Sequence, residues 1–99
     1  NELVPNEYKL LQNYPNPFNP NTSILFDIPK QSHAVLKVYD AVGRETVTLV
    51  NESLMPGSYK VDLNAGNLSS GIYFYKLEVR QAGSMTGSFI QTRKMILLK

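Results

Sequence analysis

The sequence predicts an all-β fold, an immunoglobulin-like antiparallel β-sandwich of about seven strands. Two observations carry this prediction. Apolar residues recur at every second position along several segments, which is typical of strands that bury one face. Gly, Pro, Asn and Asp gather between these segments, where the chain must turn. No segment repeats its apolar positions at helical spacing, and a chain of 99 residues has the length of one domain.

The strands are expected near residues 8–12, 22–28, 34–39, 45–50, 58–63, 72–80 and 88–98. The last run is long enough for one bulged strand or for two strands. If two sheets pack face to face, the inward residues of both sheets form the core. The alternation of apolar residues places in this core Phe26, Leu36, Val38, Tyr59, Val61, Tyr73, Tyr75 and Leu77.

Three short segments have the composition of turns between these strands. Residues 40–43 suit a type I turn with Gly43 in the left-handed region, which would close a hairpin. Pro56-Gly57 suits a type II turn in which Gly57 takes a positive φ. Residues 81–84 are expected to close the hairpin between the last two strands, and residues 64–71 form a longer connection.

The segment 14–21 differs from the rest because it holds three of the six prolines. Each proline fixes its own φ and favours an extended conformation in the residue before it. We therefore expect a stiff crossover loop without ladder hydrogen bonds, in which Tyr14 and Phe18 pack onto the sandwich.

The composition argues against several kinds of catalytic and metal chemistry. The chain has no Cys and one His, so thiolate ligands, disulfides and cysteine nucleophiles are absent. His33 lies in an expected loop, with no second ligand at metal spacing. No nucleophile elbow, phosphate-binding glycine loop or calcium-loop pattern occurs. We therefore predict a non-catalytic domain and assign it no cofactor and no metal.

Positive charge is concentrated at the end of the chain. The net charge of +2 is too small to predict nucleic-acid binding. Residues 80–99 hold four bases and no acid, whereas the other residues hold six bases and eight acids. The aliphatic run 95–98 is far shorter than the ~20 residues of a membrane-spanning helix. We expect residues 1–7 to be a linker from an upstream parent protein and residues 8–99 to be the domain.

Five sequence segments occur in an order that resembles a known family. They are Gln12 to Pro20, Val38-Tyr39-Asp40 followed by Gly43-Arg44, Pro56 to Val61, Ser70 to Tyr75, and Lys94 to Lys99. In this order they resemble the type A C-terminal sorting domains of type IX secretion, the Por secretion system. The resemblance runs from about residue 8 to residue 99. The middle of the chain is also similar to the immunoglobulin-like domain of flagellar hook-capping proteins, a related fold without the sorting role.

This resemblance implies a sorting function. Such a domain follows an upstream cargo domain, which crosses the inner membrane by a separate signal and then passes the outer-membrane translocon. A sortase-like cysteine peptidase commonly removes the domain near its N-terminal boundary, and the cargo is secreted or attached to the cell surface. The motif residues carried over are Pro56, Gly57, Tyr59, Val61, Gly71, Tyr73, Lys94 and Lys99.

These motif residues have a structural and a functional interpretation. The glycines and Pro56 suit turns, and the tyrosines suit a core. Lys is rarely buried, so the terminal lysines are harder to explain by packing. We hypothesise that the last strand presents a basic edge, formed by Arg93, Lys94 and Lys99, to an acidic or strand-forming partner on the translocon. The same edge allows a strand-paired dimer.

Two alternative functions come from other classes of protein. The chain could be a carbohydrate-binding module or a structural accessory module of a secreted multidomain enzyme. Residues 73–75 are consecutive aromatics, and exposed aromatic rings can bind sugars. The absence of Trp weakens the carbohydrate alternative.

Overall fold

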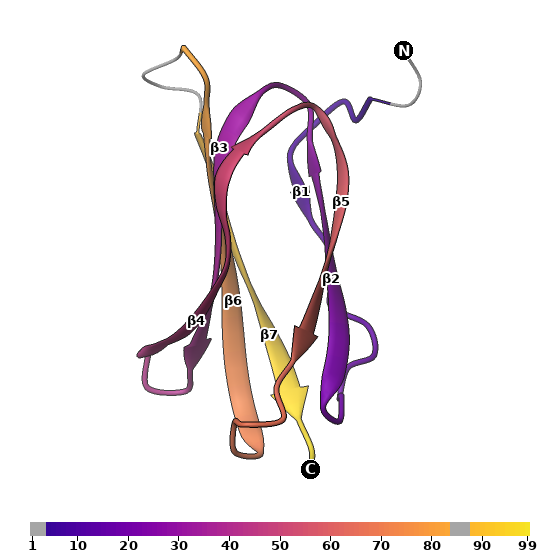
Figure 1. Cartoon of the computed structure of the whole chain (residues 1–99), viewed down its shortest axis with the longest axis vertical. Helices are drawn as coiled ribbons and strands as arrows, with labels where there is room; N and C mark the ends of the chain where they lie inside the picture. Colours follow the sequence, from indigo (N-terminus) through magenta and orange to yellow (C-terminus); the bar gives the residue numbers. More distant parts are fainter. Residues whose placement is uncertain (1–3, 84–87) are drawn as a thin grey trace.

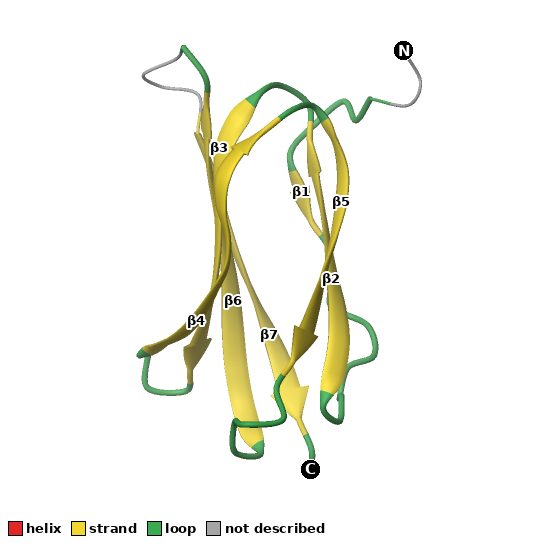
Figure 2. Cartoon of the chain, viewed as in Figure 1, coloured by secondary structure: helices red, strands yellow, loops and turns green. Residues whose placement is uncertain are grey.

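The computed structural model describes residues 4–83 and 88–99, which form seven strands in two facing sheets (Figures 1 and 2). The strands are β1 (Lys9–Leu10), β2 (Asn21–Ile28), β3 (Ser32–Asp40), β4 (Glu45–Leu54), β5 (Gly57–Asn64), β6 (Gly71–Gln81) and β7 (Ser88–Leu97). One sheet has the order β1-β2-β5, and the other has the order β4-β3-β6-β7. All pairs of strands are antiparallel. The predicted all-β sandwich is confirmed.

The strands observed follow the predicted runs closely, with differences at their ends. Only Lys9 and Leu10 pair in the first run, because β1 meets β2 over just two residues. Strand β4 continues to Leu54, four residues beyond the expected end. The last run is one strand that stays in register with β6 along its length. Two register shifts occur instead between β3 and β4.

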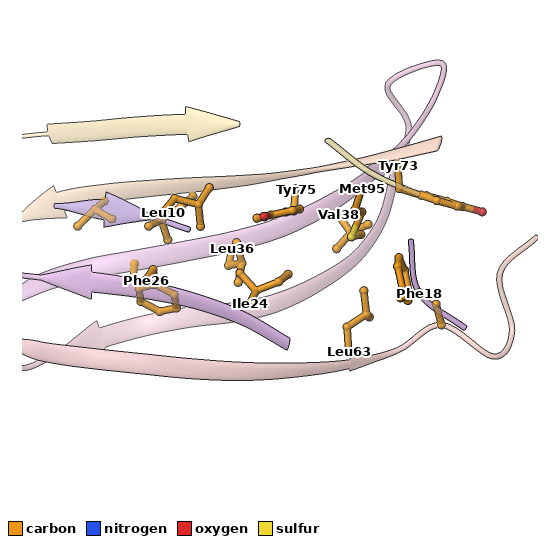
Figure 3. Packing of buried hydrophobic residues seen from close by; sticks show 14 of the residues in the cluster. Leu10, Phe18, Ile24, Phe26, Leu36, Val38, Leu63, Tyr73, Tyr75 and Met95 are labelled. Atoms are coloured by element: carbon orange, nitrogen blue, oxygen red, sulfur yellow. The ribbon is translucent and has the colours of Figure 1, made fainter. Parts of the chain in front are cut away.

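The core lies between the two sheets and is built from alternate residues of the long strands. Figure 3 shows Phe26 and Ile24 of β2 facing Leu36 of β3 and Tyr75 of β6. Leu36, Val38, Tyr75 and Leu77 are fully buried, as the alternation predicted. Tyr59 and Val61 are only partly buried and pack against the core from β5, because β5 is an edge strand whose outer side meets solvent.

The predicted turns are only partly correct. Gly43 has a φ of 90°, and its N–H donates to the Asp40 carbonyl oxygen at 3.0 Å, so the hairpin turn is confirmed. Gly57 has no positive φ and is the first residue of β5, so the type II turn was wrong. Gly83 has a φ of 73°, while Ser84 of the same expected turn lies outside the described residues.

The proline-rich segment makes hydrogen bonds that its composition did not predict. We call residues 11–18 the strap. The strap exchanges two backbone hydrogen bonds between Tyr14 and Ser23, both at 3.0 Å. Phe18 bridges to the end of β7 and is 2% exposed, whereas Tyr14 is 80% exposed. The expectation of a loop without ladder bonds was therefore wrong, and so was the packing of Tyr14; the packing of Phe18 was correct.

His33 lies in β3 rather than in a loop. Its side chain is exposed on the outer face of the four-stranded sheet, where Nε2 lies 2.8 Å from Oδ1 of Asn51 on β4. Of the polar run 30–33, Lys30 and Gln31 precede β3, whereas Ser32 is buried and His33 faces outward within the strand. No helix of the described residues is long and apolar enough to cross a membrane.

Candidate functional site

The first group of motif residues holds the connection between β4 and β5. The hydroxyl of Tyr59 donates to the carbonyl oxygen of Met55 at 2.5 Å. Its ring stacks on Phe26, with 5.5 Å between centroids. A Cβ on Gly57 would lie 3.7 Å from the Tyr59 ring, which is ordinary van der Waals contact. Tyr59 therefore holds the connection by which the chain passes from one sheet to the other, and Pro56 and Gly57 lie within or beside that connection.

The second group of motif residues holds the connection between β5 and β6. Tyr73 is 7% exposed, and its hydroxyl donates to the carbonyl oxygen of Ser69 at 2.6 Å. A tyrosine near the start of the sixth strand that bonds back to this connection is the tyrosine corner of immunoglobulin-like sandwiches. Gly71 has a φ of 155°, in a region that residues with a Cβ rarely adopt. Both residues therefore shape this loop.

Lys99 fixes the same loop from the other side. Its ammonium donates to the carbonyl oxygens of Gly66 at 2.5 Å and Leu68 at 2.9 Å. Its backbone N–H donates to Oγ of Ser70 at 2.9 Å. We call Lys99, together with residues 66–70 and Tyr73, the terminal clamp. Lys99 thus has hydrogen-bond partners that a packing argument from the sequence could not identify.

The two groups of motif residues lie at opposite ends of the sandwich. Gly57 begins β5 and Asn64 ends it, and seven steps of about 3.3 Å separate them by roughly 23 Å. Figure 1 shows the β4–β5 connection at one end and the β5–β6 connection beside the C-terminus at the other. The motif residues therefore do not meet in one site.

The three basic residues near the terminus point in different directions. Arg93 is opposite the buried Tyr75 and lies on the inner face of the sheet. Its Nε donates to the carbonyl oxygen of Leu10 at 2.6 Å. Lys94 is opposite Phe74 on the outer face and is exposed. With Lys99 in the terminal clamp, the structure does not bring these residues together as one basic edge.

The strap makes buried hydrogen bonds that could not be predicted from the sequence. The Tyr75 hydroxyl donates to the carbonyl oxygen of Leu11 and accepts the N–H of Asn13, both at 2.8 Å. Burial raises the pKa of Tyr75, although the Asn13 N–H and the Arg93 charge oppose this shift. Asn13 is 2% exposed and also donates to Oγ1 of Thr22 at 3.0 Å. The Asn and Pro residues suggested a loop, and only the tertiary partners show that Asn13 is buried.

The strap also covers one half of the β7 edge. Nε2 of Gln12 donates to the carbonyl oxygen of Lys94 at 2.8 Å. Oδ1 of Asn16 accepts the N–H of Ile96, and the N–H of Phe18 donates to the Ile96 carbonyl oxygen, both at 2.9 Å. The strap therefore acts as a short extra strand along the second half of β7.

Charged groups elsewhere support turns rather than a reacting centre. The backbone N–H of Arg44 lowers the pKa of Asp40, whose carboxylate also accepts hydrogen bonds from the Arg44 side chain and the Val42 N–H. A hydrogen bond from Thr48 lowers the pKa of Glu45. Within residues 4–83 and 88–99 there is no cluster of three potential metal-binding side chains.

A groove lies on the outer face of the four-stranded sheet. Its volume is about 410 Å³, and it is lined by His33, Val35, Glu78, Val79, Arg80, Ser88 and Ile90. None of these residues is Phe, Tyr or Trp. Tyr73 and Tyr75 are buried and only Phe74 of that trio faces outward, so the consecutive aromatics do not form a sugar-binding platform.

Together these features define a small β-sandwich in which the strap and Lys99 are bonded into the fold. Its motif tyrosines, Tyr59 and Tyr73, hold the connections between the sheets. A sequence model of the family described as secretion system C-terminal sorting domain matches residues 12–93. The chain belongs to this family. It is a sorting signal of type IX secretion, which directs its cargo to the cell surface or out of the cell, and the family is one of signals rather than enzymes.

The fold is also similar to part of a known structure. Dimeric latent PorU from Porphyromonas gingivalis matches with a TM-score of 0.63 and 20% identity, over 96% of this chain and 10% of that one. At this identity the likeness shows the fold alone, and the chain spans about a tenth of the length of that protein. No curated protein sequence matches the chain.

Proposed function

We propose that this domain is read as a folded unit when it carries an upstream cargo domain through the outer-membrane translocon. The observation that carries this proposal is the terminal clamp. Lys99 donates three hydrogen bonds, at 2.5, 2.9 and 2.9 Å, to the β5–β6 connection. A partner would therefore meet the terminal residues as part of a folded surface and not as a loose peptide.

In this proposal most motif residues act on sorting through the fold. Tyr59 and Tyr73 each bond to a backbone carbonyl four residues earlier, and each secures a connection between the two sheets. Substituting them would change the population of folded tail rather than remove a contact with the translocon. Lys94 is the motif residue whose exposed side chain is available for direct contact.

The ends of the domain suit a tail that is removed after transport. Residues 4–8 lie at the end of the sandwich opposite Lys99 (Figure 1). We propose that the cargo domain connects through the linker 1–7 and that a sortase-like cysteine peptidase cuts there. The terminal clamp lies at the far end of the domain, so cutting the linker would leave it intact.

An export assay tests the proposed function. A passenger with a secretory signal peptide is fused to residues 1–99 and produced in a bacterium that has type IX secretion. We expect the passenger outside the outer membrane, and in the periplasm when the translocon gene is deleted. Export that persists without the translocon, or retention of the intact fusion, would contradict the proposal.

A matched pair of variants tests whether the tail is read as a folded unit. Phe26 is fully buried, and its neighbour Leu25 is 39% exposed. Because an unpaired carboxylate in the core is strongly destabilising, we expect Phe26→Asp to abolish export. Leu25→Asp makes the same change in charge and should leave export unchanged.

A further inference from the structure

The four strand edges of the sandwich differ in how they are protected against pairing with other chains. Strand β1 has only two paired residues, and β4 carries two register shifts. Strand β5 alternates exposed charges, with Lys60 and Asp62 on its outer face. Short strands, bulges and charges are the usual means of blocking an exposed edge. Strand β7 is ten residues long and pairs with β6 without a register shift. Its two charged residues, Arg93 and Lys94, both lie in its second half, so residues 88–92 lack these protections.

The strap covers only the second half of β7. It bonds to the backbone of Lys94, Ile96 and Leu98. In an antiparallel pair, alternate residues direct their backbone N–H and C=O groups toward the neighbouring strand. Ile90 and Thr92 are an even number of residues from Lys94, so their backbone groups also point away from β6. Within the described chain no hydrogen bond reaches those groups of Ile90 or Thr92. We call residues 88–92 the open edge.

The open edge favours β-strand pairing by its composition. Its residues Ser88, Phe89, Ile90, Gln91 and Thr92 include no charge and no proline, and β-branched and aromatic residues favour strands. Ile90 is 63% exposed and borders the groove on the outer face of the sheet. On the inner face, Tyr8 stacks on Phe89 with 5.6 Å between ring centroids. This contact packs the inner side of the open edge against the rest of the sandwich.

The charges around the open edge are mostly positive. Exposed Arg80 and His33 line the groove. Exposed Lys94 lies outside the groove, two residues beyond Thr92 and on the same face of the sheet. The groove also contains Glu78, whose carboxylate lies 3.4 Å from the ammonium of Lys76. Of the ion pairs within the described residues, none involves Arg80 or Lys94. A strand with an apolar centre and acidic ends would complement this surface.

We propose that the open edge is where the secretion machinery adds an extended strand to the four-stranded sheet. The occupant is a short segment of a machinery protein, with an apolar residue beside Ile90 and carboxylates near Arg80 and Lys94. A five-residue edge is too short for a stable dimer, whose interface takes ~20–30 residues on each side. It suits the brief contact of a passing cargo. This inference rests on the proposed function and names the surface that the secretion machinery binds.

A photo-cross-linking experiment tests the occupant. A photo-reactive phenylalanine analogue replaces Ile90 in the passenger fused to residues 1–99, and in a control fusion it replaces the exposed Leu25 on the opposite sheet. We expect position 90 to cross-link a machinery protein through a segment with acidic residues, and position 25 to give at least about tenfold less adduct. Export without an adduct from position 90, or an adduct with a second copy of the fusion, would overturn the proposal.

Two variants test the contact itself. Ile90→Pro removes one outward N–H and keeps the ladder with β6. We therefore expect export to fall up to about tenfold, the effect of losing one main-chain hydrogen bond. The double variant Arg80→Glu with Lys94→Glu should also lower export, although it leaves the backbone unchanged. Lys60→Glu on the other sheet should leave export unchanged.

Thermal unfolding of the purified chains checks that each variant is folded at the assay temperature. If folded Ile90→Pro and the double variant export as well as the parent chain, the inference fails and the proposed function stands. If the parent fusion itself is not exported, both fail.

Discussion

Replacing Tyr75 with Phe should destabilise the domain by disconnecting the strap from β6. The ring is fully buried and stays in place, but the hydroxyl that joins Leu11 to Asn13 is lost. The Asn13 N–H is then buried without a partner, which costs ~1–3 kcal/mol, and the lost donor bond adds ~0.5–1.5 kcal/mol. We expect a loss of about 2–3 kcal/mol in the free energy of unfolding.

Thermal unfolding measures this loss directly. For a domain of this size, 1 kcal/mol lowers Tm by roughly 4–8 °C, so Tyr75→Phe should lower it by about 10–20 °C. Tyr14→Phe is the matched control, because Tyr14 is 80% exposed and should change Tm by little. If the two variants unfold within about 2 °C of each other, the strap does not stabilise the sandwich as described.

Three further predictions concern the turns and the terminal clamp. Lys99→Met should lower the free energy of unfolding, measured with denaturant, by about 1 kcal/mol. Lys60→Met on the exposed face of β5 should leave it unchanged. Gly71→Ala should lower the free energy of unfolding by about 1–3 kcal/mol, because φ is 155° there. An unchanged midpoint of denaturant unfolding would refute this. The lowered pKa of Asp40 contributes stability that is present above its unfolded pKa and is lost as pH falls through the folded one. In Asp40→Asn the free energy of unfolding should therefore fall less steeply as pH drops below about 4. If the variant and the parent chain lose stability equally over that range, Asp40 is not the cause.

The strands could be predicted from the sequence because alternation is a local signal. In β6, every second residue from Tyr73 to Val79 is apolar and buried, and the pattern alone places the strand and its inner face. Gly57 shows the limit of this approach. Pro-Gly is a common turn pair, but here Gly57 is already the first residue of β5 and pairs with Ile28 of β2, a partner that the local sequence does not reveal.

The site could be predicted less well because its contacts join distant parts of the chain. Lys99 was expected at an exposed edge, and its partners lie about thirty residues earlier in the sequence. Asn13 looked like a loop residue, and its burial depends on Tyr75 and Thr22. The covered half of β7 was expected to be the contact surface. The open edge, residues 88–92, could not be predicted, because the strap that covers only the second half of β7 is distant in the sequence.

The central claim is that sorting reads the folded sandwich and that Lys99 acts through the fold. The most direct test is export of the passenger carrying Lys99→Met, measured at two temperatures, one at which the purified variant is fully folded and one at which it is partly unfolded. We predict export equal to that of the parent tail at the lower temperature and a loss at the higher one that follows the unfolded fraction. Export that stays low while the variant is fully folded would contradict the claim and show that Lys99 is read directly.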